Sequence, residues 1–234
     1  MTESSSRPAL HAVGDAPAAR QAEGSAAHYF SAQPSSAEER RQLSVRLAGR
    51  ELPVWTANGV FSQDRLDLGT SVLLQEAPEP PARGNLLDLG CGWGPVALTM
   101  ALLAPAATVW AVDVNERALA LTEANARAHG LAGVRAVLPD DVPADVAFDA
   151  IWSNPPIRIG KAALHELLLQ WLPRLAPDGT AYLVVQRNLG ADSLLPWLAG
   201  TLGAGYAVEK YASAKGFRVL RVHRPAPAPL PDPA

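Results

Sequence analysis

The chain has 234 residues, of which 48% are hydrophobic and 18% are charged, with 20 Lys and Arg against 23 Asp and Glu. This composition fits one globular domain with a substantial core, and it excludes fibrous, collagen-like and wholly disordered proteins. A formal net charge of −3 argues against a protein that coats nucleic acid without sequence preference.

The single cysteine, Cys91, excludes two further kinds of protein. One thiol can form neither an intramolecular disulfide framework nor a multi-cysteine zinc site. The histidines have no partners at metal-ligand spacing, so we expect no metal. No apolar run reaches the ~20 residues that a membrane-spanning helix needs, and the N-terminus carries no export signal. We therefore expect a cytoplasmic protein without a membrane partner.

The two ends of the chain have the composition of unstructured tails. Residues 1–27 are rich in Ala, Ser and Gly, and residues 225–234 are rich in proline. Neither tail is expected to belong to the fold.

Residues 28–80 are expected to form a small N-terminal appendage. Two alternating segments, QLSVRL and ELPVW, flank a turn at Ala48–Arg50 and predict a β-hairpin, and a loop leading into a helix follows. A proline-rich segment at Glu76–Asn85 has the composition of a linker. The main domain is therefore expected at residues 81–224.

After the linker, strand patterns alternate with amphipathic helix patterns. Strands that are apolar throughout and that alternate with helices predict a mostly parallel sheet covered on both faces. The last two strands have no helix between them and predict an antiparallel hairpin at the sheet edge. The fold class is thus α/β, with a doubly wound, seven-stranded sheet. The expected strands begin with NLLDL, TVWAVDV, VRAVL, FDAIWSN and TAYLVVQ, and the edge hairpin covers about Ala207–Tyr211 and Phe217–His223.

In a doubly wound sheet, ligands bind at the carboxyl ends of the strands, so the strand-to-helix turns are the places to look for chemistry. The first turn reads DLGCGWGP over Asp88–Pro95. Gly90, Gly92 and Gly94 allow a tight turn and let a ligand approach the backbone without collisions with Cβ atoms. The spacing differs from the G-x-G-x-x-G of dinucleotide enzymes, and no phosphate-binding lysine motif follows. The turn favours a nucleotide without a pyrophosphate over glycines present for packing alone.

Acidic residues follow the next two strands. Asp113 lies 19 residues after Gly94, close to the offset at which a carboxylate holds a ribose diol. We expect Asp113 to bind a ribose and Val114 to pack against an adenine; the alternative is that Asp113 only caps the following helix. Asp140 or Asp141 could accept a hydrogen bond from the adenine amino group, or could belong to an exposed acidic loop.

The third turn, SNPPI over Ser153–Ile157, indicates the chemistry. Pro155 and Pro156 leave a rigid segment without backbone N–H groups, so its carbonyls and the Asn154 side chain face the site chiefly as acceptors. Acceptors suit an amino group on a planar ring, because binding the amine hydrogens directs the nitrogen lone pair toward an electrophile. We expect these three residues to position the reacting nitrogen; the alternative is a loop stiffened by proline for structural reasons.

In this order and spacing, DLGCGWGP, AVDVN and SNPP resemble the S-adenosylmethionine-dependent methyltransferases of the Rossmann-like type. Two flanking segments, VFSQDRLDLGTSVLL and SAKGFRVLRV, more narrowly resemble the small-domain methyltransferases that make N2-methylguanine in small-subunit ribosomal RNA. The resemblance covers about residues 28–224. It implies S-adenosylmethionine as cofactor, a guanine N2 amine as methyl acceptor, and ribosomal RNA or the small ribosomal subunit as partner.

The resemblance also implies residue roles. Gly90, Gly92 and Gly94 would line the methionine part of the cofactor. Asp88 would lie near the cofactor's amino group, and Asp113 would hold the ribose. Asn154, Pro155 and Pro156 would grip the target amine.

Two features depart from the family pattern. Ile157 follows the prolines where such enzymes usually carry Phe or Tyr to stack on an extruded base. Stacking would then fall to Tyr29, Phe30 or Phe61, each of which could instead belong to the core. The ribosomal enzymes also commonly carry a second, degenerate methyltransferase domain that helps to hold RNA, which we do not expect in a chain of this length.

Basic residues outnumber acidic ones from the fourth expected strand, FDAIWSN, onward. Residues 150–224 contain nine basic residues and four acidic ones. Arg158 and Lys161 closely follow the SNPP turn, and Lys215 and Arg218 lie on the expected edge hairpin. All four could bind phosphate or could be ordinary solvated charges. The candidate substrate-binding residues are Phe61, Ile157, Arg158, Lys161, Lys215 and Arg218.

Three other functions stay open. A related N-P-P enzyme methylates a glutamine side chain in translation release factors. A small-molecule amine methyltransferase suits the slightly acidic balance of the chain. A degenerate cofactor-binding scaffold could recruit RNA without catalysis, although the intact SNPP turn disfavours it. The modified nucleotide and the oligomeric state are not predicted.

Overall fold

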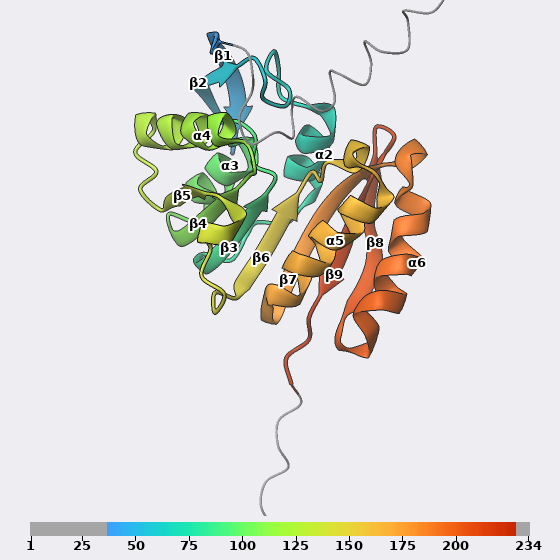
Figure 1. The fold of residues 1–234 in the computed structure, drawn as a ribbon. Coiled ribbons are helices and arrows are strands. Elements are labelled where there is room, and N and C mark those ends of the chain that lie inside the picture. The colour runs from blue at the N-terminus through green and yellow to red at the C-terminus, as the bar shows by residue number, and fades with distance from the viewer. Residues whose placement is uncertain (1–36, 228–234) are drawn as a thin grey trace, which may run out of the picture.

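The computed structural model describes residues 37–227 (Figure 1). The expected N-terminal tail at 1–27, the aromatic candidates Tyr29 and Phe30, and most of the expected tail at 225–234 lie outside the described residues.

A two-stranded antiparallel hairpin opens the described part of the chain. It consists of β1 (Arg40–Leu47) and β2 (Arg50–Ala57), as the alternating pattern predicts. Ala48 and Gly49 form its turn with φ angles of 46° and 77°, the left-handed conformation that two-residue hairpin turns require. The hairpin forms a sheet of its own and does not pair with the main sheet.

Helix α2 (Leu68–Glu76) follows the hairpin and packs against two strands of the main sheet, β7 (Leu175–Gln186) and β9 (Phe217–His223). Residues 77–82 connect α2 to β3 (Arg83–Leu89). The connection is shorter than the expected linker at 76–85, because the first residues of β3 already pair with β4. The segment before the main sheet is thus held against it by α2.

The main sheet has seven strands in the order β5-β4-β3-β6-β7-β9-β8. The first five are parallel, and β9 runs antiparallel between β7 and β8, so the predicted edge hairpin is confirmed. The chain enters the sheet at β3, moves outward to β5 and returns to β6, which makes the sheet doubly wound. The remaining strands are β4 (Ala106–Val112), β5 (Val134–Val137), β6 (Phe148–Ser153), β7 (Leu175–Gln186), β8 (Ala207–Ala214) and β9 (Phe217–His223).

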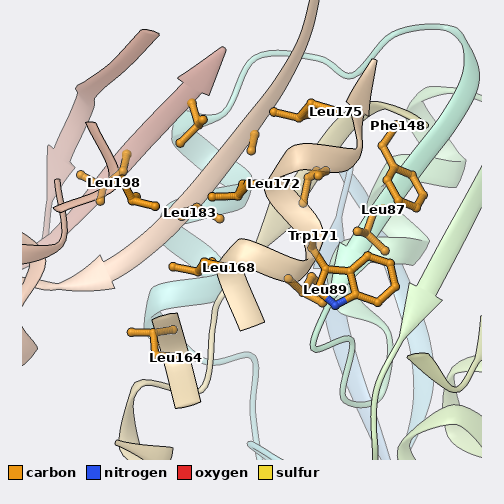
Figure 2. Packing of buried hydrophobic residues seen from close by; sticks show 14 of the residues in the cluster. Leu87, Leu89, Phe148, Leu164, Leu168, Trp171, Leu172, Leu175, Leu183 and Leu198 are labelled. Carbon is orange, nitrogen blue, oxygen red and sulfur yellow. The ribbon is translucent and has the colours of Figure 1, made fainter. Parts of the chain in front are cut away.

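Helices cover both faces of the sheet (Figure 1). Successive strand residues point to opposite faces, so Leu86 packs with residues of α2 and α3 while Leu87 packs with residues of α5 and α6. Figure 2 shows the second of these cores around Leu168 and Trp171. No helix within residues 37–227 is both long and apolar enough to cross a bilayer. The helices are α3 (Pro95–Leu103), α4 (Glu116–Ala128), α5 (Lys161–Trp171) and α6 (Ala191–Leu202).

Asn125 on α4 joins the hairpin to the glycine turn. Its Oδ1 accepts a hydrogen bond from the Trp55 N–H (2.7 Å), and its Nδ2 donates to the carbonyls of Trp55 (2.9 Å) and Trp93 (3.0 Å). Asn125 is fully buried and Trp93 is 1% exposed, so water cannot readily replace the amide at the Trp93 carbonyl, whereas the bonds to Trp55 are only partly buried.

We expect Asn125→Ala to lower the free energy of unfolding by about 2 to 3 kcal/mol, because it leaves the buried Trp93 carbonyl and two partly buried backbone groups of Trp55 unpaired. Glu123→Ala, on the exposed face of the same helix, is the control and should change stability by less than about 0.5 kcal/mol. Urea denaturation of the two variants measures both values. Equal, small losses in the two variants would contradict this account of Asn125.

Candidate active site

A cavity of about 440 Å³ opens at the carboxyl ends of the parallel strands. It lies where β3 and β6 are neighbours, at the point where the strand order reverses, which is where open α/β sheets bind ligands. Its volume lies in the range of sites for small ligands. The predicted site residues that line it are Phe61, Gly90, Gly92, Asp113, Val114, Asn154, Pro155, Pro156, Ile157 and Arg158.

The glycine turn forms one wall of the cavity. Gly90 and Gly92 have φ angles of 80° and 56°, and a Cβ atom on Gly90 would meet no heavy atom within 4 Å. Gly94 has a different role, because a Cβ atom there would lie 2.9 Å from the Thr122 side chain. Gly94 caps α3, whose first residue is Pro95, and it does not line the cavity. Direct contact between Gly94 and a ligand stays a prediction.

Asp113 ties the second turn to the first. Its Oδ2 accepts a hydrogen bond from the Gly92 N–H (2.9 Å), and its Oδ1 accepts one from the Asn115 N–H (3.0 Å). The cap of α4 is Asn115, so the alternative in which Asp113 only caps this helix is wrong. Burial raises the pKa of the Asp113 carboxyl above its ordinary value. The two hydrogen bonds fix the orientation of the carboxylate, which lines the cavity.

Asp88 lies beneath the glycine turn and lines a smaller hollow that shares Gly90 and Asn154 with the cavity. It is 1% exposed, and its Oδ2 accepts a hydrogen bond from the Ala97 N–H (2.8 Å). Burial raises the pKa of Asp88 to about 8, against the lowering effect of the Ala97 hydrogen bond, and the nearby Asp113 charge adds to the rise. A cation bound in this hollow would favour the charged form of Asp88.

The Asn154 side chain is held by the segment that precedes the main sheet. Its Nδ2 donates to Asp67 Oδ2 (2.8 Å) and to Thr70 Oγ1 (3.0 Å). A carboxylate can only accept hydrogen bonds, so the amide NH₂ must face Asp67 and the amide oxygen must face away from it. The oxygen is therefore the amide atom that a ligand in the cavity can use.

The two proline carbonyls were expected to face the site as acceptors. In the structure the Pro155 carbonyl accepts a hydrogen bond from the Ile157 N–H (2.8 Å), and the Pro156 carbonyl accepts one from the Ile159 N–H (3.1 Å). Each carbonyl oxygen has a second lone pair, so a ligand bond to either one stays a prediction. Both proline carbonyls thus already accept a hydrogen bond within the turn, and Asn154 Oδ1 is the atom of this turn that we expect to accept the main hydrogen bond from a ligand.

Sequence reasoning missed Asp67 and Thr70. Asp67 caps α2 by accepting a hydrogen bond from the Thr70 N–H (3.0 Å). An Asp directly before a helix pattern is a sequence signal for such a cap, so this role could have been predicted. No local signal reveals that the same carboxylate binds Asn154, 87 residues away. Gly69 permits this approach, since a Cβ atom there would lie 2.9 Å from the Phe217 ring and 3.0 Å from Asp67 Oδ2.

Besides Gly94 and Asp88, four predicted site residues do not line the cavity: Asp141, Lys161, Lys215 and Arg218. Pro139, in the same turn as Asp141, does line it. Arg218 forms an ion pair with Asp192, and Lys215 Nζ lies 3.5 Å from Gln75 Oε1. Roles for these four residues in ligand binding stay predictions. Within residues 37–227 no group of three or more His, Cys, Asp or Glu side chains is placed to hold a metal ion.

Comparison with known proteins identifies the family. The profile described as the methyltransferase small domain matches residues 51–221, from β2 to β9. The chain belongs to the methyltransferase small-domain family. The resemblance predicted from the glycine, acid and SNPP motifs is therefore confirmed.

Relatives of this methyltransferase small-domain protein fall into two groups by length. It is 32% identical to the protein YbxB of Bacillus subtilis (strain 168) over 200 residues, which cover 84% of this chain and 98% of YbxB. It is 33% identical to the ribosomal RNA small subunit methyltransferase C of Pseudomonas paraeruginosa over 83% of this chain and 58% of that protein. The match to the Vibrio vulnificus protein of the same name is 38% identical and covers 51% of this chain and 35% of that protein.

A solved structure has the same architecture. The T. thermophilus 16S rRNA N2 methyltransferase, in complex with AdoMet and guanosine, superimposes with a TM-score of 0.66 at 26% sequence identity. The match covers 82% of this chain and 52% of that chain. The methyltransferase small-domain protein thus spans about half the length of the ribosomal RNA methyltransferases that it matches.

The raised pKa of Asp88 makes stability depend on pH. Between the ordinary pKa near 4 and the folded value of about 8, the folded state binds a proton that the unfolded state has released, so the free energy of unfolding falls as pH rises. We expect Asp88→Asn to reduce this fall by at least about 1 kcal/mol, since a pKa difference of one unit corresponds to 1.36 kcal/mol. Urea denaturation of the wild type and of Asp88→Asn at intervals between pH 4 and pH 8 measures the fall in the free energy of unfolding. Parallel curves of this free energy against pH for the two proteins would refute the prediction.

Proposed function

We propose that the protein transfers a methyl group from S-adenosylmethionine to the exocyclic N2 amine of a guanine in small-subunit ribosomal RNA. The observation that carries the proposal is that one cavity brings together the glycine turn, the Asp113 carboxylate and the Asn154 amide. The relatives named ribosomal RNA small subunit methyltransferase C and the solved structure that holds AdoMet and guanosine support the substrate class. Such a substrate would place the reaction in the cytoplasm.

The residues of the cavity fit this cofactor. Gly90 leaves open space beside the turn, the carboxylate of Asp113 suits a ribose diol, and Val114 and Pro139 offer apolar contact to a purine. Asp88, buried in the adjoining hollow, suits the positive charge of the methionine part. When bound, S-adenosylmethionine supplies an electrophilic methyl group.

Asn154 would position the acceptor amine. Asp67 and Thr70 both accept hydrogen bonds from its Nδ2, so the amide cannot rotate without breaking two hydrogen bonds. The fixed Oδ1 can accept a hydrogen from the target amine and so direct the nitrogen lone pair toward the methyl group. This is catalysis by orientation, and it requires no strong base near the amine. The amine proton can leave to water after transfer.

The outer part of the cavity suits a flat base. Phe61 is 47% exposed and Leu189 is 43% exposed, and both line the cavity together with Ile157 and Phe217. Phe61 and Phe217 supply aromatic surface that Ile157 lacks, so either can take the stacking role that the family usually gives to the residue after the prolines. Arg158 also lines the cavity and can contact an RNA phosphate.

Tritium-labelled S-adenosylmethionine tests the substrate. The full chain is incubated with separated ribosomal subunits, with free nucleosides and with an RNA-free protein extract. We expect label in small-subunit RNA, recovered as N2-methylguanosine after digestion. Label in a protein would support the glutamine methyltransferase alternative, label in nucleosides alone would support a small-molecule enzyme, and label in no fraction would contradict catalysis.

Asn154→Ala tests the role of the diproline turn. We expect kcat on the labelled substrate to fall about 100-fold, because the amine is no longer oriented. The affinity for S-adenosylmethionine, measured by calorimetry, should change by less than about threefold. Asp113→Ala is the comparison variant, with the opposite pattern of a large loss of cofactor affinity. Unchanged turnover in Asn154→Ala would remove Asn154 from the mechanism.

A further inference from the structure

Trp171, the last residue of α5, contains a buried hydrogen-bond donor without a partner. Its side chain is fully buried, and the indole Nε1 makes no hydrogen bond. Within residues 37–227 the only other buried side-chain nitrogen or oxygen without a partner is Arg221 Nε, and that guanidinium pairs with Glu209 through Nη1. Buried side-chain donors usually have a partner, so an unpartnered indole N–H beside a cavity indicates a ligand that supplies one.

The Trp171 side chain is directed toward the carboxyl edge of the sheet. α5 begins at the carboxyl edge of the sheet, and side chains on a helix lean toward the helix N-terminus, so Trp171 reaches back toward this edge. Trp171 lines the cavity together with Leu167 and Gln170 of the same helix. In Figure 2 the indole nitrogen lies beside Leu89, the last residue of β3, which also lines the cavity.

The part of the cavity around Trp171 is the side that suits the cofactor's purine. Trp171 belongs to the same buried cluster as Leu89, Val112 and Val142, which lie on β3, β4 and just after the turn that follows β5. Val112 directly precedes Asp113, so the ribose site is next to this cluster. The aromatic side chains Phe61 and Phe217 come from other segments, the loop after β2 and the start of β9.

We infer that the Trp171 indole N–H donates a hydrogen bond to a ring nitrogen of the cofactor's adenine, which makes α5 part of the binding site. The inference rests on the proposed function, because it needs S-adenosylmethionine in this cavity. N1, N3 and N7 of adenine are acceptors without a proton, and each can receive an N–H donor. Without the ligand, the buried N–H is unpaired; with the ligand, it is satisfied.

Trp171→Phe removes the N–H and keeps an aromatic ring in the core. We expect the affinity for S-adenosylhomocysteine, measured by calorimetry, to fall about tenfold, because one net hydrogen bond is lost. Trp110→Phe is the matched control. Its Nε1 donates to Asn85 Oδ1 (3.1 Å), and it does not line the cavity, so its loss should leave the affinity unchanged.

Deaza analogues separate a lost hydrogen bond from a lost packing contact. S-adenosylhomocysteine and its 1-deaza, 3-deaza and 7-deaza forms are titrated into both the wild type and Trp171→Phe. We expect the tenfold difference between the two proteins to disappear for one of the three analogues, the one that lacks the accepting nitrogen. The same loss for all four ligands would overturn the inference, since it would report packing alone.

A measurement on the wild type does not depend on how the variant folds. In a ¹⁵N-indole NMR spectrum, the Trp171 N–H resonance should move downfield when S-adenosylhomocysteine is added, while the Trp110 resonance stays in place. A Trp171 resonance that moves with guanosine and not with S-adenosylhomocysteine would overturn the adenine assignment. Binding of S-adenosylhomocysteine without any Trp171 shift would overturn the inference alone, whereas absence of binding would also overturn the proposed function.

Discussion

The site depends on one constraint, the parallel pairing of three neighbouring strands. Leu89 of β3 lies opposite Val112 of β4 and opposite Ser153 of β6, so the three turns that follow these residues begin at the same level of the sheet. The Ser153 hydroxyl strengthens this alignment by donating to the Leu89 carbonyl (2.7 Å). The glycine turn, Asp113 and Asn154 are therefore brought together by strand register, although they are distant in sequence. A slip of one residue in β6 would remove Asn154 from the cavity.

The segment that precedes the main sheet also contributes to the site. α2 packs on β7 and β9, and this packing brings Asp67 and Thr70 to the Asn154 amide. The same segment adds Phe61 to the cavity wall. The N-terminal appendage therefore completes the site, because it fixes the direction of the amide oxygen on which the proposed orientation of the amine depends.

The fold and the three turns could be predicted because each depends on local patterns. Apolar strands that alternate with helices specify a covered parallel sheet, and the topology then places every strand-to-helix turn at one edge. The contact of Asp67 with Asn154 and the unpaired indole of Trp171 could not be predicted, since both depend on how distant helices pack. Trp171 illustrates the limit: its helical spacing indicates a core residue, which it is, and nothing in the spacing shows that its side chain also lines a cavity. For the same reason, the ion pair of Arg218 with Asp192 could not be anticipated from a count of basic residues.

The most direct measurement of the central claim is a crystal structure of the protein with S-adenosylhomocysteine. The account predicts that the ribose hydroxyls lie on the Asp113 carboxylate, that the purine lies beside Val114, and that the sulfur faces the Asn154 amide oxygen. A nucleoside bound outside this cavity, or an Asn154 side chain that has left Asp67 and points away from the sulfur, would contradict it.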